Sequence, residues 1–205
     1  MTPCPPLSRL PTPRRLLSRF LREESGSISI EMLLILPLLF WCQMAVFVFF
    51  DAFRAESLDV KAAYTIGDAL SREVNAPITP EYLDSLYVLY RLLTPHARPA
   101  MLRVTVFRFT SSDNRYHVIW SQVRGSGAAR TDATLAAIRD QSLPAMFNGE
   151  VGLLVETQSR YTPAFRVGLP AFEITDMMVF QPRFAPRLCW SFGNDGPWAS
   201  DGQTC

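Results

Sequence analysis

The residues best suited to chemistry lie in a short polar stretch, residues 24–32, which leads into the longest apolar run of the chain. Gly26 supplies a peptide without a side chain, and such a peptide can lie extended in the groove of a protease. Glu31 follows five residues later and places a carboxylate at the mouth of the apolar run, where an ionisable group is costly and is by default a functional candidate. The alternative is an interfacial glutamate that only marks the start of the run.

Elsewhere the sequence offers few catalytic groups. The two histidines are His96, between Pro95 and Pro99, and His117, on a predicted strand, and neither has cysteine or carboxylate neighbours at metal-ligand spacing. No G-x-S-x-G, P-loop, H-E-x-x-H or Cys-x-x-Cys motif occurs. We therefore expect no enzyme activity, no metal site and no cofactor, and we expect His117 to face solvent or a strand neighbour. The formal net charge of +1 argues against nucleic-acid binding, which usually requires a basic surface.

The apolar run that must position Glu31 covers residues 32–50, and Gln43 is its only polar member. About 20 apolar residues cross roughly 30 Å of hydrocarbon, so we predict a transmembrane helix over residues 27–50. An ordinary secretory signal has a shorter apolar region and a small-residue cleavage site, which residues 49–53 do not provide. Basic residues precede the run and mixed charges follow it, which by the positive-inside rule places the N-terminus in the cytoplasm. The flanking charges are Arg9, Arg14, Arg15, Arg19 and Arg22 before the run, and Asp51, Glu56 and Asp59 against Arg54 and Lys61 after it.

The spacing of Gly26, Glu31 and Pro37 within these apolar residues resembles the signature of the TadE-like minor pilins, or pseudopilins, of tight-adherence (Tad, or Flp) type IV pilus systems. The match covers about residues 22–50. The resemblance implies that a prepilin peptidase cuts between Gly26 and Ser27, and that Glu31 aligns the subunit by facing the amine of a neighbouring one. After such a cut the amine of Ser27 would lie one helical turn from Glu31. Pro37 would act as a bend or a melted turn of the pilin helix, or as an ordinary kink.

The remaining pattern predicts four segments and an α+β fold. A Pro/Arg-rich cytoplasmic leader (1–26) precedes the transmembrane helix (27–50), an amphipathic stem helix (51–76) and a periplasmic head (77–205). Apolar residues at helical spacing predict one helix over residues 27–73, roughly 70 Å long and kinked at Pro37. In the head we expect a helix starting at Pro80, a hairpin, a short helix and two further strands, which together make a mainly antiparallel sheet packed on the stem, as in a pilin head. The expected ranges are 101–110 and 115–122 for the hairpin, 132–141 for the short helix, and 151–161 and 172–183 for the strands.

The four cysteines divide by predicted compartment. Cys4 falls in the cytoplasmic leader and Cys42 in the membrane, whereas Cys189 and Cys205 fall in the oxidising exterior. We expect a disulfide between Cys189 and Cys205 that closes the C-terminal tail, with two free thiols as the alternative. The aromatic residues of this tail are expected to form either a contact patch or a small satellite core, and they are Trp190, Phe192 and Trp198.

The sequence therefore favours a minor pilin or pseudopilin that takes part in assembly or priming of a Tad pilus for surface adhesion. Its expected location is the bacterial inner membrane, crossed once, with the head in the periplasm or in the pilus. The expected partners are a prepilin peptidase, other pilins, inner-membrane Tad assembly proteins and membrane lipid, but no nucleic acid. Two alternatives remain open: an unprocessed bitopic scaffold of the assembly machinery, and a signal-anchored periplasmic enzyme.

Overall fold

The computed structural model describes residues 27–74, 77–95, 99–191 and 203–205. The predictions for Cys4, Gly26, His96, Phe192 and Trp198 fall outside the described residues. The chain divides into two compact units, Met1–Val46 and Phe47–Cys205, and the division falls within one long helix. The second unit contains a four-stranded antiparallel sheet. Together with the long apolar helix, this sheet confirms the predicted α+β class.

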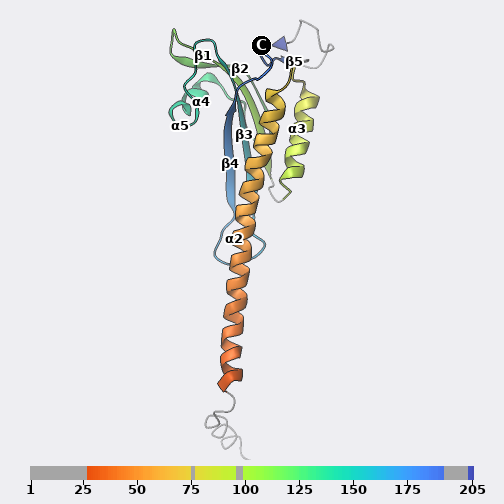
Figure 1. Ribbon diagram of the computed structural model, residues 1–205, viewed down its shortest axis with the longest axis vertical. Helices are drawn as coiled ribbons and strands as arrows, with labels where there is room; N and C mark the ends of the chain where they lie inside the picture. The colour runs from red at the N-terminus through yellow and green to blue at the C-terminus, as the bar shows by residue number, and fades with distance from the viewer. Residues whose placement is uncertain (1–26, 75–76, 96–98, 192–202) are drawn as a thin grey trace, which may run out of the picture. The chain divides into compact units, whose positions relative to one another are not determined.

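Helix α2 (Ser27–Ser71) corresponds to the single helix expected over residues 27–73. Pro37 lies inside it without ending it, although a proline removes one backbone donor and crowds a carbonyl one turn back. Pro37 is therefore not a break in the helix. In the C-terminal part of α2 (Figure 1), one narrow face is buried at helical spacing. That face consists of Ala52, Ala55, Asp59, Ala62, Ala63, Ile66 and Leu70.

The sheet has the strand order β2-β1-β3-β4, and its neighbours are all antiparallel. The predicted hairpin is confirmed as β1 (Ala100–Thr110) and β2 (Arg115–Gly125), and Asn114 in its turn has a φ of 53°. Strand β3 (Val151–Tyr161) has the expected bounds. Strand β4 (Phe172–Phe180) ends three residues before the expected position, where Pro182 could not donate to a ladder.

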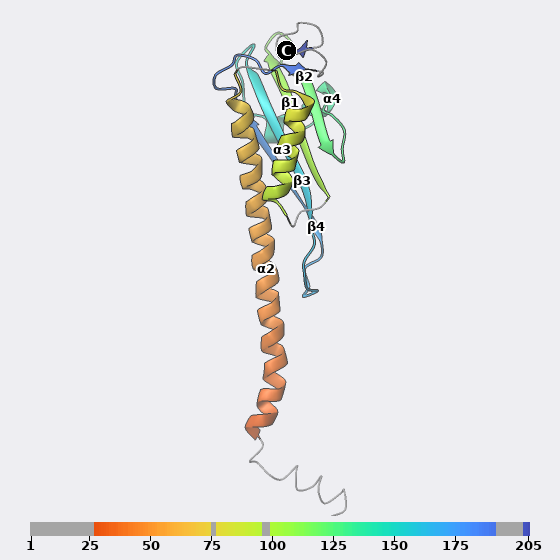
Figure 2. The ribbon, with the colours of Figure 1, turned by 90° about the vertical axis from the view of Figure 1, so that its right-hand side faces the viewer.

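Helices α2 and α3 (Pro80–Leu93) cover one face of the sheet, as Figure 2 shows. Helix α3 begins as predicted, with the Thr79 hydroxyl accepting the backbone N–H of Tyr82 at 3.2 Å. The main core joins these two helices to β1, β2 and β3. Its larger fully buried members include Ile66, Leu70, Leu83, Tyr90, Leu102 and Leu153.

The opposite face of the sheet is covered by α4 (Asp132–Ala136) and α5 (Arg139–Ser142). The prediction of one continuous helix over residues 132–141 was wrong, because two short helices occupy this segment. The chain leaves the helical region at Ile138 (φ −102°, ψ 2°), between the two short helices. Leu135 is fully buried and Ile138 packs against the same cluster of Phe107, Tyr116 and Leu154. The interruption therefore coincides with residues that pack on the sheet.

Cys189 and Cys205 form a disulfide. Strand β5 (Trp190–Ser191) pairs with β6 (Gln203–Thr204), and Trp190 also bridges to Ile78 beside α3. The Trp190 ring lies 5.5 Å from that of Trp120 and is 3% exposed, so this tryptophan belongs to the main core. The disulfide thus joins Cys205, which follows β6, to the residue just before β5, the strand that contacts the core.

Replacing both Cys189 and Cys205 by serine should lower the free energy of unfolding of the head by about 3 kcal/mol, because the cross-link closes a loop of 16 residues in the unfolded chain. Chemical denaturation of the full chain in detergent micelles, followed by near-ultraviolet circular dichroism, measures this loss. Cys42→Ser is the matched control, since Cys42 is a free and exposed thiol. Equal midpoints for the double variant and this control would contradict the prediction.

Candidate functional site

The N-terminal half of α2 leaves its apolar side chains without protein cover. Leu33 is 74% exposed, Phe40 64% and Phe50 67%, and the other large apolar side chains of residues 28–50 are similarly open except for Val48. Helix α2 is near the N-terminus, and among the described residues it is the one helix that is long and apolar enough to cross a membrane. A helix that is apolar on all sides and is not covered by its own chain is suited to a lipid environment. The chain therefore has the features of a single-pass membrane protein.

The predicted processing and alignment residues lie at the start of this helix. Gly26 is outside the described residues, and Ser27 is the first residue of α2. Glu31 is exposed and forms no hydrogen bond or ion pair with any residue in the described part of the chain. Ser27 and Glu31 are thus one helical turn apart, and no described residue supplies a counter-ion to the carboxylate.

A buried carboxylate further along α2 was missed by the sequence interpretation, which treated Asp59 only as a flanking charge. Asp59 is fully buried between α2 and the sheet. Its Oδ1 accepts hydrogen bonds from the hydroxyls of Tyr90 at 2.5 Å and Ser159 at 3.1 Å, and its Oδ2 accepts one from Thr157 at 3.1 Å. The signal was available in the helical register, because Asp59 falls on the same face as Ala52, Ala55, Ala62 and Ile66.

A second carboxyl group, Asp176 on β4, lies opposite Thr157 in the strand register and interacts with Asp59. Its Oδ2 is buried and finds no donor among the described residues. Desolvation, followed by the hydrogen bond and the charge of Asp59, raises the pKa of Asp176 to about 7. Burial therefore favours the protonated form of Asp176, whose hydroxyl is able to donate a hydrogen bond toward Asp59.

This carboxyl pair resembles acid–base machinery in its composition, but its surroundings favour a structural role. Asp59 is fully enclosed, and each of its oxygens already accepts a hydroxyl. The same interactions raise the pKa of Tyr90, first through burial and then through its hydrogen bond to Asp59. We infer that the network joins α2, α3, β3 and β4, rather than binding a substrate.

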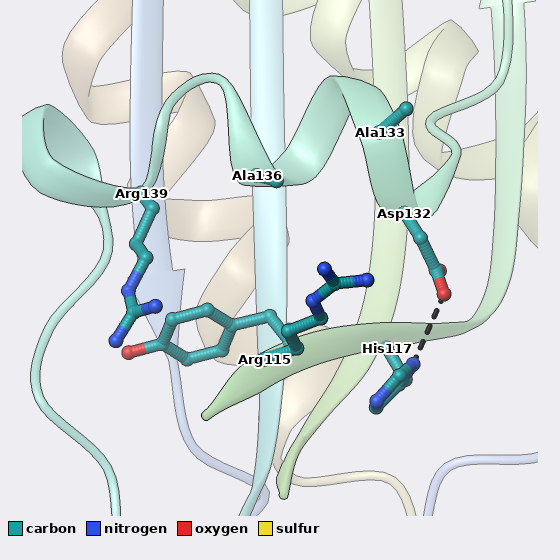
Figure 3. Close-up of a pocket in the computed structure, with 7 residues that line it drawn as sticks. Arg115, His117, Asp132, Ala133, Ala136 and Arg139 are labelled. Carbon is teal, nitrogen blue, oxygen red and sulfur yellow. Dashed lines mark hydrogen bonds and ion pairs between the residues drawn. The ribbon is translucent and has the colours of Figure 1, made fainter. Parts of the chain in front are cut away.

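His117 on β2 has a partly exposed side chain, as expected, and it also lies between two carboxylates from different segments. Its Nε2 is 2.7 Å from an oxygen of Asp113 in the hairpin turn, and its Nδ1 is 3.0 Å from an oxygen of Asp132 at the start of α4. Figure 3 shows the contact with Asp132. Hydrogen bonds to Asp132 and Asp113 raise the pKa of His117, and the pKa values of both aspartates are lowered. Asp113 is four residues before His117, a spacing that could have indicated this pair.

A pocket of about 450 Å³ adjoins His117, and its lining is shown in Figure 3. Arg139 lies over the Tyr116 ring at 5.6 Å and donates to the backbone oxygen and side chain of Asn114. Both ring nitrogens of His117 are engaged by carboxylates, so neither is free to act as a base toward a molecule in the pocket. Among the described residues no group of three or more His, Cys, Asp or Glu side chains could hold a metal ion. The hydrogen bonds of His117 to Asp113 and Asp132 therefore connect the hairpin to the start of α4.

Asp176→Asn should flatten the pH dependence of stability. The raised pKa of Asp176 means that the folded state holds a proton that the unfolded state releases near pH 4. The stabilisation is therefore complete below about pH 4, and it is lost as pH rises through about 7. Asparagine keeps a donor toward Asp59 at every pH, so the variant should melt at a higher temperature than the unmodified chain at pH 8. Thermal melts from pH 4 to 8 test this, with Glu173→Gln, an exposed side chain on the same strand, as control. Parallel curves for Asp176→Asn and the unmodified chain would contradict it.

The His117 contacts predict an imidazole that titrates above the ordinary value of 6.5. Because its folded pKa is raised, the stabilisation is present below pH 6.5 and is lost as pH rises through the folded pKa. Asp132→Asn should lower the midpoint of the His117 titration, since the hydrogen bond to Asp132 is the largest cause of the raised pKa. An NMR titration with the resonance assigned through His117→Gln measures the midpoint, and Asp140→Asn on the neighbouring α5 is the control. An unchanged midpoint in Asp132→Asn would show that the contact is absent in solution.

Comparison with known proteins assigns no family to this chain. No family model, no curated protein and no solved structure matches it.

Proposed function

We propose that this chain is a TadE-like minor pilin, or pseudopilin, that takes part in assembly or priming of a Tad pilus for surface adhesion. The observation that carries the proposal is the spacing of Gly26, Glu31 and Pro37 at the start of an exposed apolar helix. The continuation of that helix onto an antiparallel sheet supports it, because a pilin consists of an apolar stem and a head packed on its outer half. In this proposal the chain is a structural subunit and catalyses no reaction.

The state of Glu31 supports a role in subunit alignment. A carboxylate at the edge of the hydrocarbon is costly unless a cation neutralises it. Glu31 has no such partner among the described residues of its own chain. Cleavage after Gly26 creates an amine at Ser27, and the amine of a neighbouring subunit would neutralise Glu31 across the interface.

The proposed topology has the N-terminus in the cytoplasm and the head in the periplasm. Residues 1–26 contain five arginines and two acidic residues, as the positive-inside rule requires for a cytoplasmic flank. The Cys189–Cys205 disulfide supports an oxidising compartment for the head. From Glu31 to Phe50 the helix rises about 29 Å, which matches the hydrocarbon thickness.

Co-expression with a prepilin peptidase should remove residues 1–26 and expose Ser27, as intact mass spectrometry of the purified chain would show. Gly26→Ala should abolish processing, whereas Ser29→Ala, a small change within the same segment, should be cut. Glu31→Gln should be cut but lost from the sheared pilus fraction, because it cannot neutralise an amine.

A different result would favour another class of protein. If the leader stays attached with an active peptidase and the chain remains in the inner membrane after shearing, the chain is an unprocessed bitopic scaffold. If Gly26→Ala leaves the mature mass unchanged, the processing site is not at Gly26.

A further inference from the structure

The connection between β3 and β4, residues 162–171, contacts α2 beside its apolar run. In both ribbon views this loop extends along α2 toward the N-terminal end of the helix (Figures 1 and 2). The rings of Phe165 and Phe47 meet edge to face, with their centroids 6.3 Å apart. Just beyond, the hydroxyl of Tyr161 donates to Asp51 at 2.8 Å, and Tyr161 packs with Ala52 of α2. The base of the loop is therefore held against the helix.

The contact with Phe47 sets the depth of the loop. Phe47 lies within the apolar run 32–50, and about 24 Å of helix separates it from Glu31. The hydrocarbon core is about 30 Å thick, so a span that begins at Glu31 places Phe47 near its outer boundary. Phe165, in contact with Phe47, then lies at the level where acyl chains meet headgroups.

The composition of the loop suits that level. Phe165 is 42% exposed, although it is a large apolar side chain, and the neighbouring Arg166 is also exposed. Arg166 forms no ion pair with any described residue, and residues 162–171 contain no acidic side chain. Arg166 and Leu169 line an open hollow of about 620 Å³. An exposed aromatic ring beside an unpaired guanidinium is the combination that binds an interface rich in anionic lipid.

We propose that the loop of residues 162–171 is a second membrane contact, in which Phe165 enters the interfacial region and Arg166 binds lipid phosphate. The loop and α2 then hold the head at two points on the outer surface of the bilayer. The inference rests on α2 spanning the membrane and is independent of the pilus role. If a second copy of this chain covers Phe165 instead of lipid, a spin label at this position is shielded from both relaxing agents and is broadened by its neighbour.

The test measures the depth of a spin label at position 165 in the full chain. Cys4→Ser and Cys42→Ser remove the free thiols, Phe165→Cys receives a nitroxide, and the protein is reconstituted in vesicles of phosphatidylglycerol and phosphatidylcholine. The control label replaces Phe147, which is 86% exposed and precedes the other end of β3. Oxygen concentrates in the bilayer, whereas a water-soluble nickel chelate stays outside it. We therefore expect oxygen to relax the label at 165 more strongly than the chelate does, and the chelate to relax the label at 147 more strongly than oxygen does. A label at 165 that favours nickel overturns the proposal, as does one that is shielded from both and broadened by a neighbouring label.

A charge reversal tests the role of Arg166. Arg166→Glu in the labelled chain should shift the label at 165 toward water in the phosphatidylglycerol vesicles, and should shift it less in pure phosphatidylcholine. Arg160→Glu, which reverses another exposed arginine just before the loop, should leave the depth unchanged. Equal effects of the two reversals would show that Arg166 does not contact lipid phosphate. Because N-terminal processing plays no part in these measurements, their failure is distinct from failure of the proposed pilin role.

Discussion

The buried carboxylate of Asp59 is the constraint on which the packing of helix against sheet depends. A carboxylate inside a protein is costly unless donors surround it, and here the donors come from α3 and β3. On β3 the residues that face α2 alternate as Thr157, Ser159 and Tyr161, and the last of these donates to Asp51. The eight residues from Asp51 to Asp59 rise about 12 Å in a helix, and the four from Thr157 to Tyr161 rise about 13 Å in a strand. Because these lengths match, two carboxylates on α2 meet alternate hydroxyls on β3, and a register shift of either element would leave a buried charge without its donors.

Small residues on the same helix face make this close approach possible. Ala52, Ala55, Ala62 and Ala63 occupy the buried face around Asp59. At Gly67 even a methyl group would collide with the ring of Phe180, since an added Cβ would lie 2.0 Å from a ring carbon. The C-terminal half of α2 therefore has a narrow buried face on which alanine and glycine predominate, whereas its N-terminal half has large exposed side chains on all sides. One continuous helix thus serves two environments, because the size and distribution of its side chains change along its length.

The same division connects the fold to the proposed function. A subunit that passes from the bilayer into a filament needs a stem whose outer surface can exchange lipid for other stems. The large apolar side chains of residues 28–50 other than Val48 are exposed and suit such an exchange. The head needs a firm attachment to the other half of the stem, which the Asp59 network and the main core provide. The β3–β4 loop lies where the two halves meet, and a lipid contact there would orient the head relative to the bilayer before assembly.

Features that depend on neighbouring residues were predictable from the amino-acid sequence. The long helix, the start of α3 at Pro80, the hairpin and the bounds of β3 follow from side-chain periodicity, capping and turn residues, and the Cys189–Cys205 pairing followed from compartment. Contacts between groups that are distant in the sequence became visible only in the folded chain. Asp59 bonds to residues 98 and 100 positions away, His117 reaches Asp132 in another segment, and the helix after Asp132 divides at Ile138 beside the sheet. The spacing of neighbouring residues predicts helices and strands and the face on which each side chain lies. The free-energy cost of burying a charge depends instead on hydrogen-bond partners from distant parts of the chain, which only folding brings together.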